Sequence, residues 1–143
     1  METVNTLRSR LRFDSLEHIT TPDGSGRVSV RLEWADEAYE GTVSCLQTQQ
    51  GVLKAASEAT LIATVSAALA FSDDPIDLEV VGVKAVRAFD GWVVVTRVNG
   101  LVETESYRLL GAAPCEREED LPGAAVKAIL NACNRIVEHR VAR

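Results

Sequence analysis

The chain has 143 residues, a formal net charge of −6 and a pI of about 4.9. This length predicts one domain that buries its own core, and the acidic balance without a long basic stripe argues against nucleic-acid binding. No secretory signal and no run of about 18 uncharged apolar residues is present, so we expect neither secretion nor a membrane-spanning helix. Three cysteines without paired spacing favour a reducing cytoplasm over a disulfide framework.

Three strands are predicted to come first. Residues 7–20 alternate loosely and include a strand, and 21–26 have the composition of a turn. From Arg27 to Trp34 polar and apolar residues alternate strictly, as in a half-buried strand. A turn over 35–38 leads to a third strand over 39–46.

From about Gln50 to Phe71 the apolar period becomes helical. One face carries seven apolar residues, namely Val52, Ala55, Ala56, Ala59, Ile62, Ala63 and Ala70. A weaker second line consists of Leu61, Val65 and Ala68. This second line is compatible with a helix that packs on a sheet and leaves a few apolar side chains outside the contact. It is also compatible with a helix covered on two sides, as in an oligomer.

Strand and turn signals then recur. Asp90-Gly91 and Asn99-Gly100 are both typical of two-residue hairpins. They divide the next segment into three strands, over 76–89, 92–98 and 101–110. Residues 111–123 are predicted as a loop, and a final helix runs from about Leu121 to His139.

The order of elements is therefore three strands and a helix, twice. We predict an α+β fold of duplicated βββα units, with two antiparallel three-stranded sheets, each with a helix packed on one face. The halves span about 7–71 and 76–143. Residues 1–26 form a strand and turn that belong to the same domain as the duplicated region, 27–143.

Short stretches occupy corresponding places in the two halves. Tyr39-Glu-Gly-Thr and Tyr107-Arg-Leu-Leu-Gly fall in the third strand of each half. Lys54-Ala55 and Lys127-Ala128 stand near the start of each helix. The residue identity is thin, so the duplication rests mainly on the order of the elements.

Nothing in the chain is typical of catalysis or metal binding. His18 and His139 are isolated, and His139 suits the negative end of a helix dipole. Cys45, Cys115 and Cys133 lack the spacing of zinc ligands. No phosphate-loop, dinucleotide-binding, nucleophile-elbow or zinc-protease motif is present. We therefore predict no enzyme activity, no catalytic residue, no cofactor and no metal.

The two strand-to-helix loops are the better candidates for binding. Backbone N–H groups at the start of a helix can hold a carboxylate or phosphate. We expect either ordinary polar loops or a site for a small amino-acid-like or anionic ligand. The candidate ligand-binding residues are Gly41, Thr42, Gln47, Gly111, Ala112 and Cys115.

The last helix contains Asn131-Ala-Cys-Asn134-Arg135-Ile. With the βββα duplication, this stretch resembles the C-terminal regulatory (LeuA dimerisation) domain of 2-isopropylmalate synthases and related citramalate synthases. Members of that family often carry an Asn-Ala-Leu-Asn-Arg-Leu-like stretch in an Ala-rich last helix. Cys133 here replaces the Leu, and the resemblance covers roughly residues 27–140.

The resemblance implies an allosteric homodimer with an amino-acid effector in the strand-to-helix loops. The loop from Gly111 to Pro122 departs from the family pattern, because it is longer, acidic and proline-bearing. The synthase barrel is absent, since 143 residues cannot hold one. Candidate interface residues are Leu61, Val65, Ala68, Asn131 and Asn134, and we expect Asn134 to form a hydrogen bond at the sheet or dimer boundary.

We therefore predict a non-catalytic, cytoplasmic, homodimeric regulatory module that senses a small metabolite. The alternative is an assembly module with a protein partner and no small ligand. A double-stranded-RNA-binding domain needs a lysine cluster where this chain has Glu119, Asp120 and a single Lys127. A hot-dog thioesterase would have only Glu58 as a helical carboxylate and no place for the second long helix. We expect no nucleic-acid or membrane partner.

Overall fold

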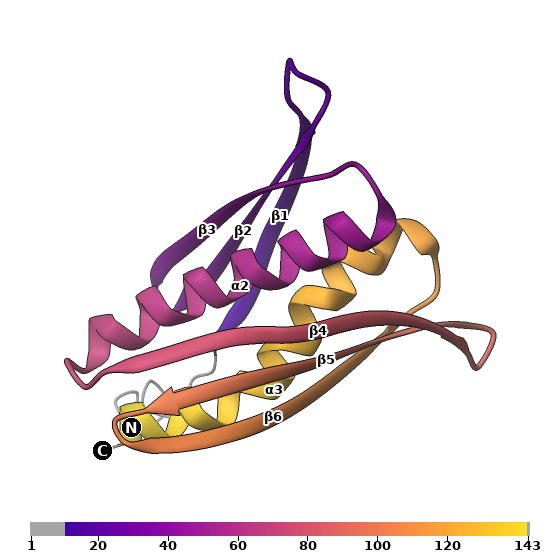
Figure 1. Ribbon diagram of the computed structural model, residues 1–143. Coiled ribbons are helices and arrows are strands. Elements are labelled where there is room, and N and C mark those ends of the chain that lie inside the picture. The colour runs from indigo at the N-terminus through magenta and orange to yellow at the C-terminus, as the bar shows by residue number, and fades with distance from the viewer. Residues whose placement is uncertain (1–10, 143) are drawn as a thin grey trace.

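Two three-stranded sheets form the outer layers of the molecule, and two long helices lie between them (Figure 1). This computed structural model describes residues 11–142, without the side chains of Arg135 and 138–142. The part of the predicted first strand before residue 11 and the predicted role of His139 lie outside the described residues. The α+β fold with duplicated βββα units is confirmed.

The first half consists of β1 (Arg12–Thr20), β2 (Gly26–Trp34), β3 (Glu37–Cys45) and α2 (Gln49–Phe71). The second half consists of β4 (Ile76–Ala88), β5 (Gly91–Val102), β6 (Glu105–Cys115), the short 3₁₀ helix η1 (Glu118–Asp120) and α3 (Leu121–Ala142). In each half the middle strand pairs antiparallel with both neighbours.

The strict alternation of β2 places its apolar side chains against the helices, where Val28, Val30, Leu32 and Trp34 are all buried. The turns after β2 and β4 are two residues long. Ala35 and Asp36 have φ of 54° and 66°, and Phe89 and Asp90 have φ of 53° and 61°. Two consecutive positive φ angles match the right-handed twist of the flanking strands.

The hairpin predicted at Asn99-Gly100 is wrong, because β5 continues to Val102. Asn99 pairs with Arg108 and Gly100 with Tyr107. A Cβ on Gly100 would lie 3.1 Å from Leu78 Cδ2 and 3.5 Å from a helix side chain, so this glycine allows close packing within the sheet. The predicted loop over 111–123 is also too long, since β6 extends to Cys115 and α3 begins at Leu121.

The two helices cover one another as well as the sheets. Leu61 of α2 is 5% exposed and packs with Val98 of β5 and Ile129 of α3. The second apolar line of α2 therefore meets the other half of the same chain. Ile62, predicted on the buried face, is instead 46% exposed.

Three hydroxyls are buried on α2 without any partner from outside the helix. Ser57, Thr60 and Thr64 each donate to the carbonyl four residues earlier, at 2.8, 2.7 and 2.7 Å. These internal bonds satisfy groups that would otherwise be costly to bury. By length and composition α2 alone among the described helices could cross a membrane, but 67% of its apolar window is buried inside the fold.

In each half the helix lies directly on a glycine of the third strand. A Cβ on Gly41 would come within 2.1 Å of the Ala59 carbonyl oxygen, and one on Gly111 within 2.0 Å of the Ala128 carbonyl oxygen. Cysteine follows the glycine by four positions in both strands and ends each strand. When the two halves are aligned on these glycine–helix contacts, Gly41 corresponds to Gly111 and Ala59 to Ala128. In this alignment Lys54 and Lys127 do not occupy equivalent positions.

We expect Gly41→Ala and Gly111→Ala to destabilise the protein by the upper part of the roughly 1–3 kcal/mol that overpacking costs. The added methyl group would overlap helix backbone, which cannot move without shifting the whole helix. Urea unfolding monitored by circular dichroism gives the free energy of unfolding.

Gly82→Ala is the matched control, because a Cβ there meets no atom within 4 Å and the backbone φ is not in the left-handed region. We expect it to leave stability unchanged or raise it by up to about 1 kcal/mol. Equal stability of all three variants would contradict the proposed close approach of helix and strand.

Candidate functional site

The strand-to-helix loops of the two halves meet beside β1. Gln49, at the start of α2, donates from Nε2 to Glu118 Oε2 of η1 at 3.1 Å. Gln47 lies next to it, with Oε1 2.7 Å from His18 Nε2 and Nε2 donating to Thr20 Oγ1 at 2.8 Å. Side-chain amides thus connect β1 to the first loop and the first loop to the second.

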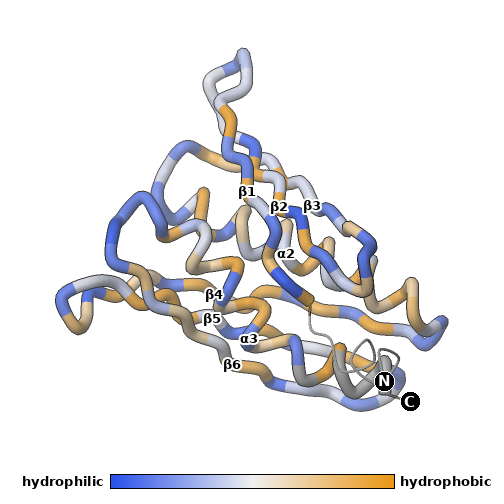
Figure 2. Tube along the Cα trace, turned by 180° about the vertical axis from the view of Figure 1, so that it is seen from behind, coloured by the Kyte–Doolittle hydropathy of each residue, from blue (hydrophilic) through white to orange (hydrophobic). Residues whose placement is uncertain are grey.

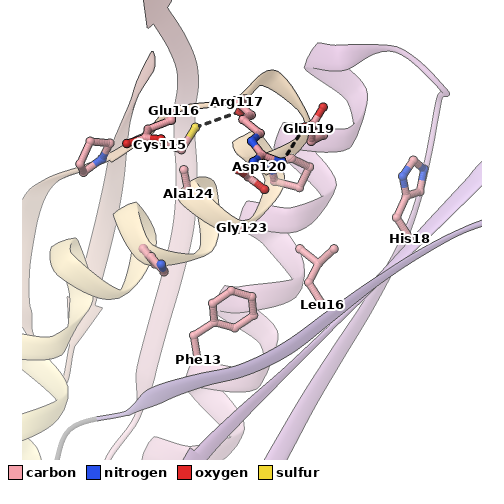
Figure 3. A pocket seen from close by; sticks show the side chains of 13 residues that line it. Phe13, Leu16, His18, Cys115, Glu116, Arg117, Glu119, Asp120, Gly123 and Ala124 are labelled. Carbon is pink, nitrogen blue, oxygen red and sulfur yellow. Dashed lines mark hydrogen bonds and ion pairs between the residues drawn. The ribbon is translucent and has the colours of Figure 1, made fainter. Parts of the chain in front are cut away.

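Two adjoining cavities open at this junction, with volumes of about 700 and 570 Å³. Both are lined by His18, Glu119 and Pro122. The larger lies between β1 and the start of α3, and the smaller reaches the start of α2 (Figure 3). A small metabolite fits within this volume range.

The larger cavity has an apolar side and a charged side. Phe13 and Leu16 of β1 are half-buried and face the cavity from one wall, as Figure 3 shows. Opposite them the chain from β6 to α3 supplies mainly carboxylates. The acidic lining residues of the two cavities are Glu116, Glu118, Glu119 and Asp120, and the basic ones are Arg117 and Lys127. This excess of carboxylates favours a ligand that carries a positive group.

The starts of both helices already have partners. Thr48 caps α2, and its Oγ1 accepts from the Gly51 N–H at 2.9 Å. The three acidic residues of η1 directly precede α3, where negative charge complements the helix dipole. We therefore do not expect bare helix amides to bind a phosphate, and the cavity walls become the more relevant binding surface.

The cysteine thiols are not activated. Burial raises the pKa of the Cys115 thiol, the nearby Asp120 carboxylate raises it further, and Lys127 acts in the opposite direction. Cys115 Sγ donates to the Arg117 carbonyl at 3.4 Å (Figure 3). Burial also raises the pKa of Cys45, and it raises that of Cys133 to about 12. Within residues 11–142 no group of three or more His, Cys, Asp or Glu side chains is arranged to hold a metal ion.

Of the six predicted ligand-binding residues, Gln47 and Cys115 line the cavities. Gly41 and Gly111 lie under the helices. Thr42 is on the outer face of its sheet, where its hydroxyl lies 3.0 Å from Ser29 Oγ, and Ala112 is exposed on β6. Whether any of these residues binds a ligand stays a prediction.

Sequence reasoning missed the wall contributed by β1, which consists of Phe13, Leu16 and His18. Leu16 and His18 are two residues apart and share a face, but Phe13 lies at the opposite parity and joins them only because the strand register shifts between Phe13 and Ser15. Only the packing of β1 beside the start of α3 brings them to the second loop.

Two of the predicted interface residues are buried within one chain, since Leu61 and Ala68 are 5% and 0% exposed. Val65 is half-buried. Asn131 donates from Nδ2 to the Ala112 carbonyl of the edge strand β6 at 2.6 Å. Asn134 Oδ1 is buried without a hydrogen-bond partner among the described residues, and a bond of Asn134 at a dimer boundary stays a prediction.

No protein-family model matches the chain, and no curated protein matches it. The geometry of the junction therefore carries the functional argument.

The raised thiol pKa values predict slow alkylation. In the folded protein at pH 8 we expect Cys45 and Cys115 to react with iodoacetamide more slowly than a free thiol, and Cys133 to react only after unfolding. Because a raised pKa keeps the thiol protonated, the rate at Cys115 should still rise above pH 9. Mass spectrometry of the labelled peptides measures this, and rapid labelling of Cys115 at pH 7 would contradict it.

Proposed function

We propose that this protein is a non-catalytic regulatory module that binds a small amino-acid-like metabolite where its two halves meet. The observation that carries the proposal is the pair of adjoining cavities lined by both strand-to-helix loops and by β1. A ligand there would contact elements of both βββα units at once. Binding can thereby change how the halves pack together, which is the physical requirement for a sensor.

The walls favour an amino acid over a simple anion. A ligand ammonium group suits the carboxylates of Glu119 and Asp120, and Lys127 supplies a positive charge for a ligand carboxylate. Phe13 and Leu16 offer an apolar surface for a side chain. The resemblance to the LeuA dimerisation domain, which implied an amino-acid effector and a homodimer, supports the same class of ligand.

The chemistry of the lining residues supports binding rather than catalysis. The thiol with access to the cavity has a raised pKa, which disfavours its nucleophilic form. His18 is hydrogen-bonded to the Gln47 side-chain oxygen at 2.7 Å, which ties its ring to the first loop. Glu58, the nominal helical carboxylate of a thioesterase, does not line either cavity.

A thermal-shift screen with free amino acids tests the proposal. A ligand at 100 times its Kd adds about 2.7 kcal/mol of stability, which corresponds to a rise of several degrees in Tm for a chain of this size. Each amino acid is compared with the amine that lacks its carboxylate and with the acid that lacks its ammonium group. We expect the intact amino acid to give the largest shift and the acid the smallest.

Glu119→Gln probes the acidic wall, because Glu119 lines both cavities. We expect the Kd from isothermal titration calorimetry to rise about threefold or more as one charge contact is lost. Glu17→Gln is the matched control, since Glu17 is exposed on β1 and lines neither cavity. Equal effects of the two substitutions would contradict binding at this site.

A second candidate function is assembly with another protein and no small ligand. The exposed apolar side chains on the second sheet favour it, notably Leu110, which is 72% exposed. A flat response to all amino acids, amines and acids would reject the sensor and leave this role.

A further inference from the structure

The outer faces of the two sheets differ sharply, although the sheets are copies of one unit. On β1–β3 the outer face carries ion pairs, with Arg31 3.1 Å from both Asp14 and Glu40, and Arg12 3.1 Å from Glu33. Such a face is well solvated. The outer face of β4–β6 carries no ion pair among the described residues of those strands.

Apolar residues take many of the corresponding places on the second sheet. Val86, Val93 and Pro114 form an apolar row across the strands, and Val95 and Ala112 share the next row with Lys84. Leu110 follows, in the row of Arg97 and at the position that Glu40 occupies in the first sheet. Figure 2 shows orange segments interspersed with pale and blue ones along these strands. Contiguous apolar patches on a monomer's surface often mark interaction sites.

We propose that this outer face of β4–β6 is the surface on which a second copy of the chain docks, sheet against sheet. The proposal gives a location to the homodimer that we predicted from the sequence, and it does not depend on the proposed ligand. The helical residues predicted for that role are covered inside one chain, notably Leu61 and Ala68. The dimer therefore needs another surface.

The face is complementary to itself about a two-fold axis along β5. Two sheets stacked in this way place β4 of one copy over β6 of the other, with strands nearly aligned. Val86 then faces Pro114 of the second copy, and the central Val93 and Val95 face their own equivalents. Small residues oppose large ones, since Gly82 lies in the row of Leu110.

The charges match in the same arrangement. Glu79 and Arg108 share a row, so Glu79 of each copy faces Arg108 of the other. A hollow of about 360 Å³ lies at this row, and its lining includes Asp77 and Glu79 as well as Arg108 of the same copy. Arg97 lies on the axis and faces its own equivalent, a like-charge contact that Glu79 in the neighbouring row offsets only in part, which favours a weak dimer.

The size of the face suits a weak dimer. Three strands of about 11 residues present about 14 by 36 Å, from the usual strand spacing and rise. This corresponds to about 500 Å² of projected surface, somewhat below the roughly 600–1,000 Å² that one partner contributes to specific, stable interfaces. We therefore expect a dimer with a Kd on the order of micromolar rather than nanomolar.

Sedimentation velocity of the full chain over a range of concentrations tests the proposal, and we expect a monomer–dimer equilibrium. Leu110→Arg should raise the dimer Kd about tenfold or more, because it places another positive charge beside Arg97 at the interface. The variant should fold, since charged Glu40 already stands at the equivalent position of the first sheet. Thr42→Arg, on the outer face of β3, is the matched control and should leave the Kd unchanged.

A charge swap gives a second, independent measurement. We expect Glu79→Arg and Arg108→Glu each to weaken the dimer about threefold or more, and the double variant to restore it, because each copy again offers opposite charges. A monomer at the highest concentration that the protein tolerates would overturn the proposal, as would a dimer insensitive to Leu110→Arg. Amino-acid binding by such a monomer would leave the proposed sensor intact and remove only the dimer.

Discussion

The close approach of each helix to a glycine in the third strand is the constraint on which the rest of the structure depends. At Gly41 and Gly111 a helix carbonyl occupies the space where a side chain would stand. Such contact needs small residues on the helix as well, and Ala59 and Ala128 supply them. Because each helix lies close against its own sheet, the helix face that points away from that sheet can pack against the second helix. Both helices are thereby covered from two sides within one chain.

This packing also determines where a ligand can bind. Because both helices begin at the same end of the molecule, the loops that precede them converge, and β1 forms the remaining wall. The hydrogen bond between Gln49 and Glu118 connects the two loops directly. The junction is therefore sensitive to the relative position of the two halves. Of the residues on the second sheet's outer face, Pro114 also lines the larger cavity, whereas Leu110 and Glu79 line neither cavity. Association can therefore be altered at Leu110 or Glu79 without changing a cavity wall.

Local pattern was sufficient to predict much of the fold. Strict alternation from Arg27 to Trp34 marked β2, and the alanine-rich period marked α2, because both reflect the side of an element that is buried. The hairpin predicted at Asn99-Gly100 was wrong for a physical reason. The turn propensity of this pair is local, whereas β5 continues through it because Gly100 lets neighbouring side chains pack closely. Tertiary contacts override local preference in such cases.

The candidate site was less accessible to sequence reasoning. Gln47 and Cys115 were within reach because they stand in loops before helices. Phe13, Leu16 and His18 were not, since their contribution depends on β1 lying beside a helix that begins a hundred residues later. The glycines before those loops were correctly singled out as special, yet the structure places them in helix packing.

Joining two βββα units in one polypeptide has a consequence that separate identical subunits cannot share. In a symmetric pair of single units, every substitution appears twice, on both sides of the axis. Here each half accumulates its own changes: an asparagine ties α3 to its edge strand where α2 has Ile62, and Leu110 stands where the other copy has Glu40. Because the two units lie in one chain, the first sheet can keep a charged, hydrated outer face while the second sheet exposes apolar side chains.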